Sequence, residues 1–456
     1  MCRKRSSSKC IESKKEKEGA EDLSNWMRNL PIEGRKCPLF NLAIPGTVVA
    51  DTLRSVLLIL KRKLFSTGSH DSGSFGLETK SGIGPDLKKR WFIRFFPFLA
   101  FPIIKKWTVT QSLSIPDQLA SGIRYFDLRA GPKNKSGLGR NTGSDVGRNT
   151  GSDVGRSTGS DVGRSSQRKV SKQEKDSSNG ISDEEKVVGK ELISEPINEP
   201  ISDTNEEEDL FFVHGLFGPR ITDMCVEMNQ FLDDHPQEVI IVHIQHFLET
   251  NIHQQIHLLN QIKSIFGSKL LPFRPEFRVP TLDSMSRHGF QVILFYPSKC
   301  PLYQESPLYQ ESPLYQKSPL YQESPPHQKY QECPEVIWPP ELLPNPWANT
   351  TSVDSLKSFL SANVSKREPD RFFVTQGVLT PSDSFIKRHL FSSLKSKLAI
   401  KCNQAMTEWI KKIDGSKFGP NIVMTDFVEW NDCIIPKIVV TLNYELINRS
   451  TNEKEE

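Results

Sequence analysis

The chain has 456 residues, of which 36% are hydrophobic and 25% charged, and its formal net charge is +4. So small a charge on a chain of this length attracts polyanions weakly, and we expect no nucleic-acid partner. The eight cysteines are scattered without a CxxC pair, which favours free thiols over a disulfide framework or a zinc site.

Residues 1–20 form a basic, charged leader without the apolar stretch of a secretory signal, so we expect a cytoplasmic protein. The most apolar run, WFIRFFPFLAFPII at 91–104, is shorter than the roughly 18–20 residues that span a bilayer. Arg94 and Pro97 also interrupt it. Burial against the rest of the fold and docking on lipid both stay open for this run.

Seven short apolar runs, rich in β-branched and aromatic residues, indicate buried strands. They are FNLAI (40–44), GIRYFDL (122–128), LFFVHG (210–215), EVIIVHI (238–244), GFQVILFY (289–296), RFFVTQG (371–377) and NIVMTDF (421–427). Helical patterns lie between several of them, at 221–236, 251–266 and 354–360. This alternation predicts one α/β domain, and a single irregular TIM-like (β/α) barrel is preferred over an open sheet.

The predicted barrel domain spans 21–446 and is followed by a polar tail at 447–456. Two long segments interrupt it: 131–208, with an octapeptide repeat based on GRNTGSDV, and 299–335, with a hexapeptide repeat based on PLYQES. Both repeats are polar and far shorter than the roughly 20–50 residues of a solenoid unit. We therefore expect both segments to be long disordered loop insertions.

Chemically capable side chains stand at the ends of the predicted strands, and the carboxyl ends of parallel barrel strands share one face. They include Asp127, Arg129, His214, Gln245, His246, Gln376 and Asp426. With His70 and Asp71 of the segment GSHDS, the set suits phosphodiester chemistry, because one imidazole can accept a proton and a second can donate one. Carboxylates orient the imidazole rings, and a guanidinium matches a phosphoryl group.

The ordered segments NLAIPG, GSHDSGSFG, WTVTQSLSIPDQLASGIRYFDLR, LFFVHGLFGPRITDMCVEMNQFLDDHPQEVIIVHIQHF, VPTLDSMSRHGFQVILFY, IWPPELLPNPWANTT, FFVTQGVLTP and NIVMTDFVEW carry a resemblance. As a set they resemble the phosphatidylinositol-specific phospholipase C X domain-containing proteins, relatives of the bacterial phosphatidylinositol phospholipases C. The resemblance covers most of 21–446 outside the insertions. It implies a TIM-like barrel and phospholipase C chemistry.

The resemblance also implies a role for five catalytic residues. His70 matches the general base that acts on the inositol 2-hydroxyl, and Asp426 matches the carboxylate that orients it. His214 matches the general acid that protonates the diacylglycerol oxygen, with Asp71 as its partner. Arg129 matches the arginine that steadies the phosphoryl oxygens.

We expect substrate contacts at a second group of residues: Asp127, Gln245, Gln376 and Trp347. In the large calcium-dependent eukaryotic phospholipases C, carboxylates at the positions of Arg129 and Gln245 hold the ion, with an Asn at Asp71. A fixed guanidinium would repel a hard cation and supply its positive charge, so we expect metal-independent chemistry without a cofactor. The pair in HQQIH (253–257) lacks the glutamate of HExxH, and we expect no metal there.

One departure from the family pattern is Thr47–Gly68, which separates the IPG motif from Ser69; another is His243, where relatives usually carry Asp. Three interpretations of 47–68 stay open: an amphipathic helix that touches membrane, a neutral excursion, or unspliced or mispredicted coding sequence. If the segment displaced His70 by about 1 Å, the rate would fall by about 100-fold.

We expect a phosphoric diester hydrolase that cleaves phosphatidylinositol to diacylglycerol and inositol phosphate, acting as a monomer in transient, peripheral contact with intracellular membranes. The alternative is a catalytically inactive barrel that binds phosphoinositides or membrane, its site spoiled by the 47–68 insertion. A third, weaker alternative is a scaffold that works through the tyrosine-rich repeat.

Overall fold

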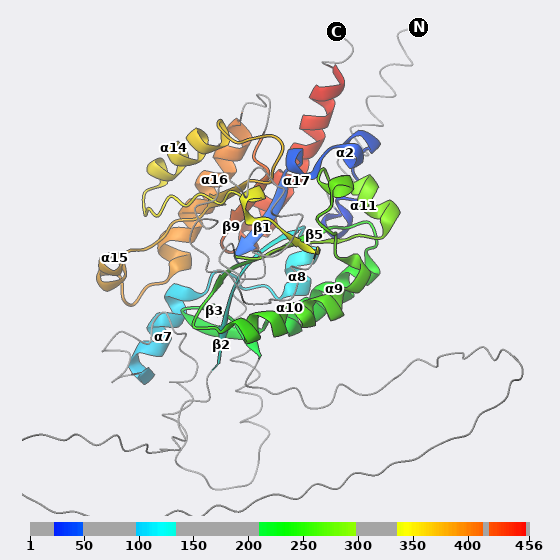
Figure 1. Ribbon diagram of the computed structural model, residues 1–456. Coiled ribbons are helices and arrows are strands. Elements are labelled where there is room, and N and C mark those ends of the chain that lie inside the picture. Colours follow the sequence, from blue (N-terminus) through cyan, green and yellow to red (C-terminus); the bar gives the residue numbers. More distant parts are fainter. Residues whose placement is uncertain (1–21, 49–96, 134–208, 298–334, 414–418, 453–456) are drawn as a thin grey trace, which may run out of the picture. The chain divides into compact units, whose positions relative to one another are not determined.

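The computed structural model describes residues 22–48, 97–133, 209–297, 335–413 and 419–452 (Figure 1). These residues build one sheet with the strand order β7-β6-β5-β2-β1-β9-β8. All neighbouring strands along this path are parallel. They are β1 (Ile44–Val48), β2 (Tyr125–Pro132), β5 (Ile240–Phe247), β6 (Val292–Phe295), β7 (Ile337–Trp338), β8 (Val374–Gly377) and β9 (Ile422–Thr425).

The strands curl into a barrel, because β1 pairs with both β2 and β9, the last strand of the chain. Side chains from all the parallel strands meet in one buried core cluster inside the barrel. Its members include Ile44, Tyr125, Ile241, Ile293, Trp338, Val374 and Ile422. The predicted single irregular (β/α) barrel is therefore confirmed.

A seam remains between β7 and β8, which do not pair with each other. The chain that follows β7 spans this seam, because Val374 N donates to Pro344 O at 2.9 Å. Further from the strands, Thr380 N donates to Thr350 O at 2.8 Å. Closure on this side thus depends on a few bonds from a loop instead of a strand ladder.

Helices surround the strands, as Figure 1 shows. Those after the first strands are α7 (Pro97–Thr108), α8 (Ile115–Ala120), α9 (Ile221–Asp234), α10 (Ile252–Phe266) and α11 (Leu282–His288). Those in the last third are α14 (Val353–Val364), α15 (Asp383–Arg388), a π-helix (Lys395–Ala399), α16 (Ile400–Lys412) and α17 (Trp430–Asn452). A short α2 (Ile32–Lys36) precedes β1. The three predicted helices correspond to α9, α10 and α14.

Local sequence explains several of these boundaries. Asn251 caps α10 in a capping box with Gln254, and Thr281 does the same for α11 with Ser284. Gly289 ends α11 in the left-handed conformation, at φ 74°, which glycine adopts without steric cost. Apolar periodicity together with these caps made the helices predictable.

The strand predicted at 40–44 is wrong in place, because a 3-10 helix covers Leu39–Asn41 and β1 begins at Ile44. The dipeptide Pro45-Gly46 is typical of a turn, yet both residues belong to β1. A Cβ at Gly46 would lie 2.8 Å from Tyr125 Cδ1 and 3.2 Å from Ile422 Cγ2, so glycine is required where three strands pack. The strand continues through Thr47 and Val48, which pair with Phe126 and Asp127.

The run 210–215 forms a strand, but an antiparallel one instead of a parallel barrel strand. β3 (Leu210–His214) and β4 (Leu216–Arg220) make a hairpin that extends from the end of β2. Gly215, at φ 71°, allows the tight turn between them. The sequence LFGPR does not predict the strand β4, because Gly and Pro normally interrupt strands.

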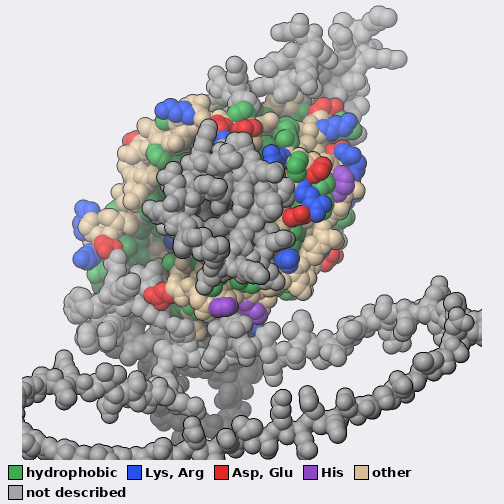
Figure 2. All heavy atoms as spheres, viewed as in Figure 1, with side chains coloured by type: hydrophobic (Ala, Val, Ile, Leu, Met, Phe, Trp, Pro, Cys, Tyr) green, Lys and Arg blue, Asp and Glu red, His purple; other side chains and the backbone are tan. Residues whose placement is uncertain are grey.

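Lys and Arg side chains are interspersed with Asp and Glu on the face shown in Figure 2. Within the described ranges, no helix has both the length and the apolar character that crossing a membrane requires. The apolar run 91–104 is described only from Pro97 onward, where it enters α7. In this helix Ile104 and Trp107 are buried.

Candidate active site

The structure describes every predicted site residue except His70 and Asp71, which lie outside the described residues. The other catalytic candidates come from three elements at the carboxyl end of the barrel. Arg129 lies on β2, His214 ends β3, and Asp426 directly follows β9. Topology thus brings residues almost 300 positions apart in sequence to one end of the sheet.

Strand alternation places a buried polar layer above the apolar interior of the barrel. Tyr125 belongs to the interior core cluster, so Asp127, two residues later on β2, faces the same side. By the same spacing His243 follows Ile241, Gln376 follows Val374, and Asp426 follows Met424. We use the name polar layer for Asp127, His243, Gln376 and Asp426, whose exposed fractions are 3%, 6%, 8% and 5%.

Arg129 is the cationic centre of the site. It faces the same side of β2 as Asp127, and its positive charge lowers the pKa of Asp127, His214 and His246. Its Nε atom is buried and has no hydrogen-bond partner among the described residues. A half-buried guanidinium with an unused donor is suited to binding an anion.

A β-bulge shapes the strand beside Arg129. The pairing between β2 and β5 shifts here: Leu128 pairs with Ile244 and Arg129 pairs with His246, which leaves Gln245 between them. Bulges re-aim side chains and occur often beside active sites. The predicted substrate contact Gln245 is thus at a break in the ladder, and His246 takes the position opposite the guanidinium.

His214 is anchored by the end of α7, because its Nδ1 atom lies 2.7 Å from Thr108 O. A carbonyl accepts, so this contact places the proton on Nδ1 and leaves Nε2 for the substrate. Burial lowers the pKa of His214 to about 4, with Arg129 acting in the same direction and the Thr108 bond opposing. In these surroundings His214 is a neutral imidazole near neutral pH.

Asp127 is a buried carboxyl at the centre of a small polar network. Burial raises its pKa to about 7, while Arg129 and the side chain of Asn345 oppose the shift. Asn345 also contacts Gln376, whose Nε2 donates to Asn345 Oδ1 at 2.5 Å and to Asn345 O at 3.2 Å. Asn345 therefore links the loop after β7 to β8 across the seam. One oxygen of Asp127 stays without a hydrogen bond in the described part.

Asp426 is held by the backbone around it. Asn403 Nδ2 donates to Asp426 O at 2.8 Å, and Phe427, the next residue, has a φ of 50°. Gln111 braces both sides: its Nε2 donates to Thr425 O at 3.0 Å, and its Oε1 accepts from Val428 N at 3.0 Å. Burial raises the pKa of the Asp426 carboxyl to about 7. A non-glycine residue at positive φ stores backbone strain, which is common at functional sites.

His243 is buried in the layer and bonded to Tyr125, with Nδ1 2.9 Å from the phenol oxygen. Burial lowers its pKa to about 3, and His246 adds to the shift. His243 therefore stays neutral at physiological pH. This neutral ring lies next to Asp127, its partner across the strand pair.

Trp347 lies on the loop after β7 and is 53% exposed. Its Nε1 donates to Thr380 Oγ1 at 2.9 Å, which fixes the ring to the loop after β8. The structure therefore places Trp347 at the rim, apart from the buried layer. Asn345, two residues earlier, is the polar contact that sequence reasoning missed, because a loop residue between two prolines carries no strand periodicity.

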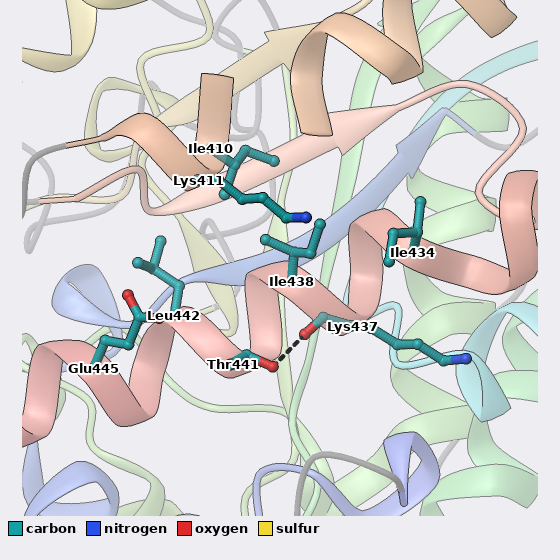
Figure 3. Close-up of a pocket in the computed structure, with 8 residues that line it drawn as sticks. All are labelled: Ile410, Lys411, Ile434, Lys437, Ile438, Thr441, Leu442 and Glu445. Carbon is teal, nitrogen blue, oxygen red and sulfur yellow. Dashed lines mark hydrogen bonds between the residues drawn. The ribbon is translucent and has the colours of Figure 1, made fainter. Parts of the chain in front are cut away.

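A groove of about 310 Å³ lies between α16 and α17, away from the predicted residues (Figure 3). Apolar side chains from both helices line it, including Ile410, Ile438 and Leu442, and none of the polar layer contributes. Among the residues that the structure describes, no group of three His, Cys, Asp or Glu side chains is placed to hold a metal ion.

Comparison with known proteins gives a consistent set of relatives. No protein-family model matches the chain. It is 28% identical over 428 residues to PI-PLC X domain-containing protein 2 of Mus musculus, covering 94% of this chain and 89% of the relative. It is 27% identical over 427 residues to PI-PLC X domain-containing protein 3 of Homo sapiens, covering 92% of this chain and 94% of the relative. For PI-PLC X domain-containing protein 1 of Mus musculus the identity is 24% over 434 residues, covering 94% and 88%.

Similar solved structures include the phosphatidylinositol-specific phospholipase C from Listeria monocytogenes, with 15% identity and a TM-score of 0.47. That alignment covers 92% of this chain and 98% of the other. A variant of the phosphatidylinositol-specific phospholipase C from Staphylococcus aureus has 12% identity and a TM-score of 0.46, with coverage of 93% and 98%.

Proposed function

Because this chain is a homologue of the PI-PLC X domain-containing proteins, we propose that it is a phosphoric diester hydrolase of the phospholipase C type. Its substrate is phosphatidylinositol, and its products are diacylglycerol and an inositol phosphate. The observation that carries the proposal is the half-buried cationic centre Arg129, set between His214 and the polar layer at the carboxyl end of the barrel.

In the proposed reaction the inositol 2-hydroxyl oxygen attacks phosphorus, and its proton passes to His70. The bond between phosphorus and the diacylglycerol oxygen breaks, and His214 delivers a proton to that oxygen. Asp426 orients His70, and Asp71 supports protonated His214. The immediate product is a cyclic inositol phosphate, which water opens in a second step. The reaction needs no metal, because Arg129 stabilises the charge on the phosphoryl oxygens.

The charge of Arg129 has two opposite effects on this reaction. In the free protein it helps to lower the pKa of His214, which disfavours the protonated form that a general acid requires. A bound phosphodiester anion would neutralise the guanidinium and so remove one of the two causes of that shift. Substrate binding and protonation of His214 are then coupled, and we expect the acid to form in the complex with substrate.

The low pKa of His214 is also the observation that supports a second candidate function. A barrel in which His214 stays neutral would bind a phosphoinositide head group at Arg129 without cleaving it. Such a protein is a lipid-binding relative of the enzymes. The two candidates share a ligand and differ in turnover, so one assay separates them.

The test incubates purified protein with phosphatidylinositol vesicles and a calcium chelator, and follows soluble inositol phosphates. For the enzyme we expect chelator-resistant release that falls by about 10²–10⁴-fold in His214→Ala. The control is His288→Ala, which removes an exposed histidine from α11. No release from protein that still binds the vesicles would reject the hydrolase and favour the lipid-binding barrel.

A further inference from the structure

The segment 108–111 begins with the last residue of α7 and contacts the acid side of the candidate active site. Thr108 O lies 2.7 Å from Nδ1 of His214, the proposed general acid. Figure 1 shows α7 near β3, the strand that ends with this histidine. Further along the segment, Thr110 and Gln111 are only 3% and 1% exposed, although they belong to a loop. Polar groups buried in a loop need hydrogen-bond partners from other elements.

On the base side, Gln111 bonds the backbone before and after Asp426. Its Nε2 donates to Thr425 O at 3.0 Å, and its Oε1 accepts from Val428 N at 3.0 Å. Thr425 ends β9, and Val428 lies two residues beyond Asp426. Because one planar amide makes both bonds, it holds these two backbone groups at a fixed separation. Asp426 lies between them.

Thr110 connects the segment 108–111 to two further backbone groups. Its carbonyl oxygen accepts from Phe427 N at 2.6 Å, and its hydroxyl donates to Val48 O at 3.1 Å. Phe427 has a φ of 50°, so the first bond helps to hold a strained residue in place. Val48 is the last residue of β1, after which the chain runs on toward His70. The segment is therefore bonded to elements on both sides of the proposed reaction.

We propose that Gln111 is a positioning residue for Asp426, and that the segment 108–111 fixes the acid and base sides of the site relative to each other. This inference rests on the proposed function, since it concerns the same reaction. Two proton transfers on one phosphodiester require the acid and the base to be aligned at the same time. A segment bonded to His214 and to the loop of Asp426 resists separate movement of the two.

Gln291 offers a matched comparison, because it is a buried glutamine with similar bonds at the opposite end of the barrel. It directly precedes β6, and its Nε2 donates to three carbonyl oxygens at 3.0–3.2 Å. These belong to Leu232, His235 and Glu238. Both glutamines hold backbone groups, and Gln111 holds those that flank a proposed catalytic carboxylate. Loss of either amide should lower stability, whereas loss of Gln111 should also slow the chemistry.

The test compares Gln111→Met with Gln291→Met in steady-state kinetics on phosphatidylinositol vesicles, with rates normalised to folded protein. For Gln111→Met we expect kcat to fall by about 100-fold, as for a displacement of about 1 Å, and KM to change by less than about two-fold. Gln291→Met should match wild type in both constants. Equal losses of kcat in the two variants, or an unchanged kcat in Gln111→Met, would overturn the proposal.

A double-mutant cycle tests whether Gln111 acts through Asp426. When Gln111→Met is added to Asp426→Asn, we expect kcat to fall by less than about three-fold further, because the carboxylate that would be displaced is already absent. A further loss as large as that in the wild-type background would assign Gln111 to another group and overturn the proposal.

Thr110 supplies a second pair of variants if Gln111→Met does not fold. Thr110→Val keeps the shape of the side chain and removes the hydroxyl that bonds Val48 O, so we expect kcat to fall by about ten-fold. Thr110→Ser retains the hydroxyl and should restore the wild-type rate. Equal rates in the two variants would overturn the proposal, because the hydroxyl would then have no part in alignment.

The positioning role and the proposed function can fail separately. If wild-type protein releases no inositol phosphate, the hydrolase is rejected, and hydrogen exchange of the backbone amides at 425–428 decides the positioning role. We expect these amides to exchange at least about ten-fold faster in Gln111→Met than in wild type, and at the wild-type rate in Gln291→Met. Exchange that is equally fast in the two variants would overturn the proposal.

Discussion

The two ends of the barrel interior are made of different residues. At the amino end Ile44, Ile241 and Ile422 meet as an apolar cluster, whereas at the carboxyl end the same strands continue into the polar layer. Burial of the apolar end stabilises the folded protein. The polar end lowers this stability, because buried carboxyls and imidazoles are costly to ionise. The first residues of these strands therefore stabilise the fold, and their last residues supply the chemically reactive side chains.

The largest effect should come from the cationic centre. Arg129→Met keeps the length of the side chain and removes the charge, so we expect hydrolysis to fall by about 10²–10³-fold. The unfolding temperature should change little, because the guanidinium Nε has no partner to lose in the described structure. Initial rates on phosphatidylinositol vesicles and a thermal melt measure both.

The control for that variant is Arg287→Met, in which the arginine lies on α11 and is 66% exposed. Its activity should match that of wild type. An Arg129→Met protein with unchanged rates would show that the guanidinium does not bind the phosphoryl group.

At the apolar end we expect a substitution to lower stability and to leave activity unchanged. Ile241→Ala leaves a cavity among fully buried side chains, and we expect the free energy of unfolding to drop by about 2–5 kcal/mol. Specific activity of the folded fraction should be retained, because the polar layer is unchanged. Chemical denaturation combined with rates normalised to folded protein tests this. Activity lost in the folded fraction would mean that the two ends are not independent.

A pH-dependent effect of comparable size concerns the stability cost of the polar layer. The pKa of Asp426 is raised to about 7 in the folded protein, above the value of 3.8 for the unfolded chain. Between these values the folded state holds a proton that the unfolded state has lost, so this group makes stability fall as pH rises from about 4 to 7. Asp426→Asn should remove that dependence and gain about 4 kcal/mol above about pH 7.

Denaturant unfolding of Asp426→Asn and wild type at about pH 4 and about pH 8 would measure this difference. The two proteins should be equally stable at the lower pH and diverge at the higher one. If the gap is the same at both pH values, the carboxyl is not the titrating group.

Much of this arrangement was predictable from residue patterns. Apolar runs predict most of the parallel strands, and the rule that carboxyl ends share a face predicts that Arg129 and Asp426 lie at the same end of the barrel. Chain regions without a clear period were harder to predict. β7 has only two residues, and Pro45-Gly46 reads as a turn although packing against Tyr125 requires that glycine. The contact between Asn345 and Gln376 could not be predicted, because it depends on the geometry of a loop.

The roles of His70 and Asp71 remain predictions from the family motif, since both lie outside the described residues. β1 continues in register through Val48, so the strand that leads toward them is intact to that point. Of the other residues with a proposed catalytic role, His214 and Asp426 lie within the described part of the chain.

The seam between β7 and β8 gives the barrel the mechanics of a split ring. Elsewhere a ladder of strand pairing resists widening, but here the described backbone bonds run from a loop, through Pro344 and Thr350. A ring cut at one point opens most easily along the cut. The contact between Asn345 and Gln376 spans it at the level of the polar layer, so a bulky head group that pressed on this contact would meet the most compliant wall of the site.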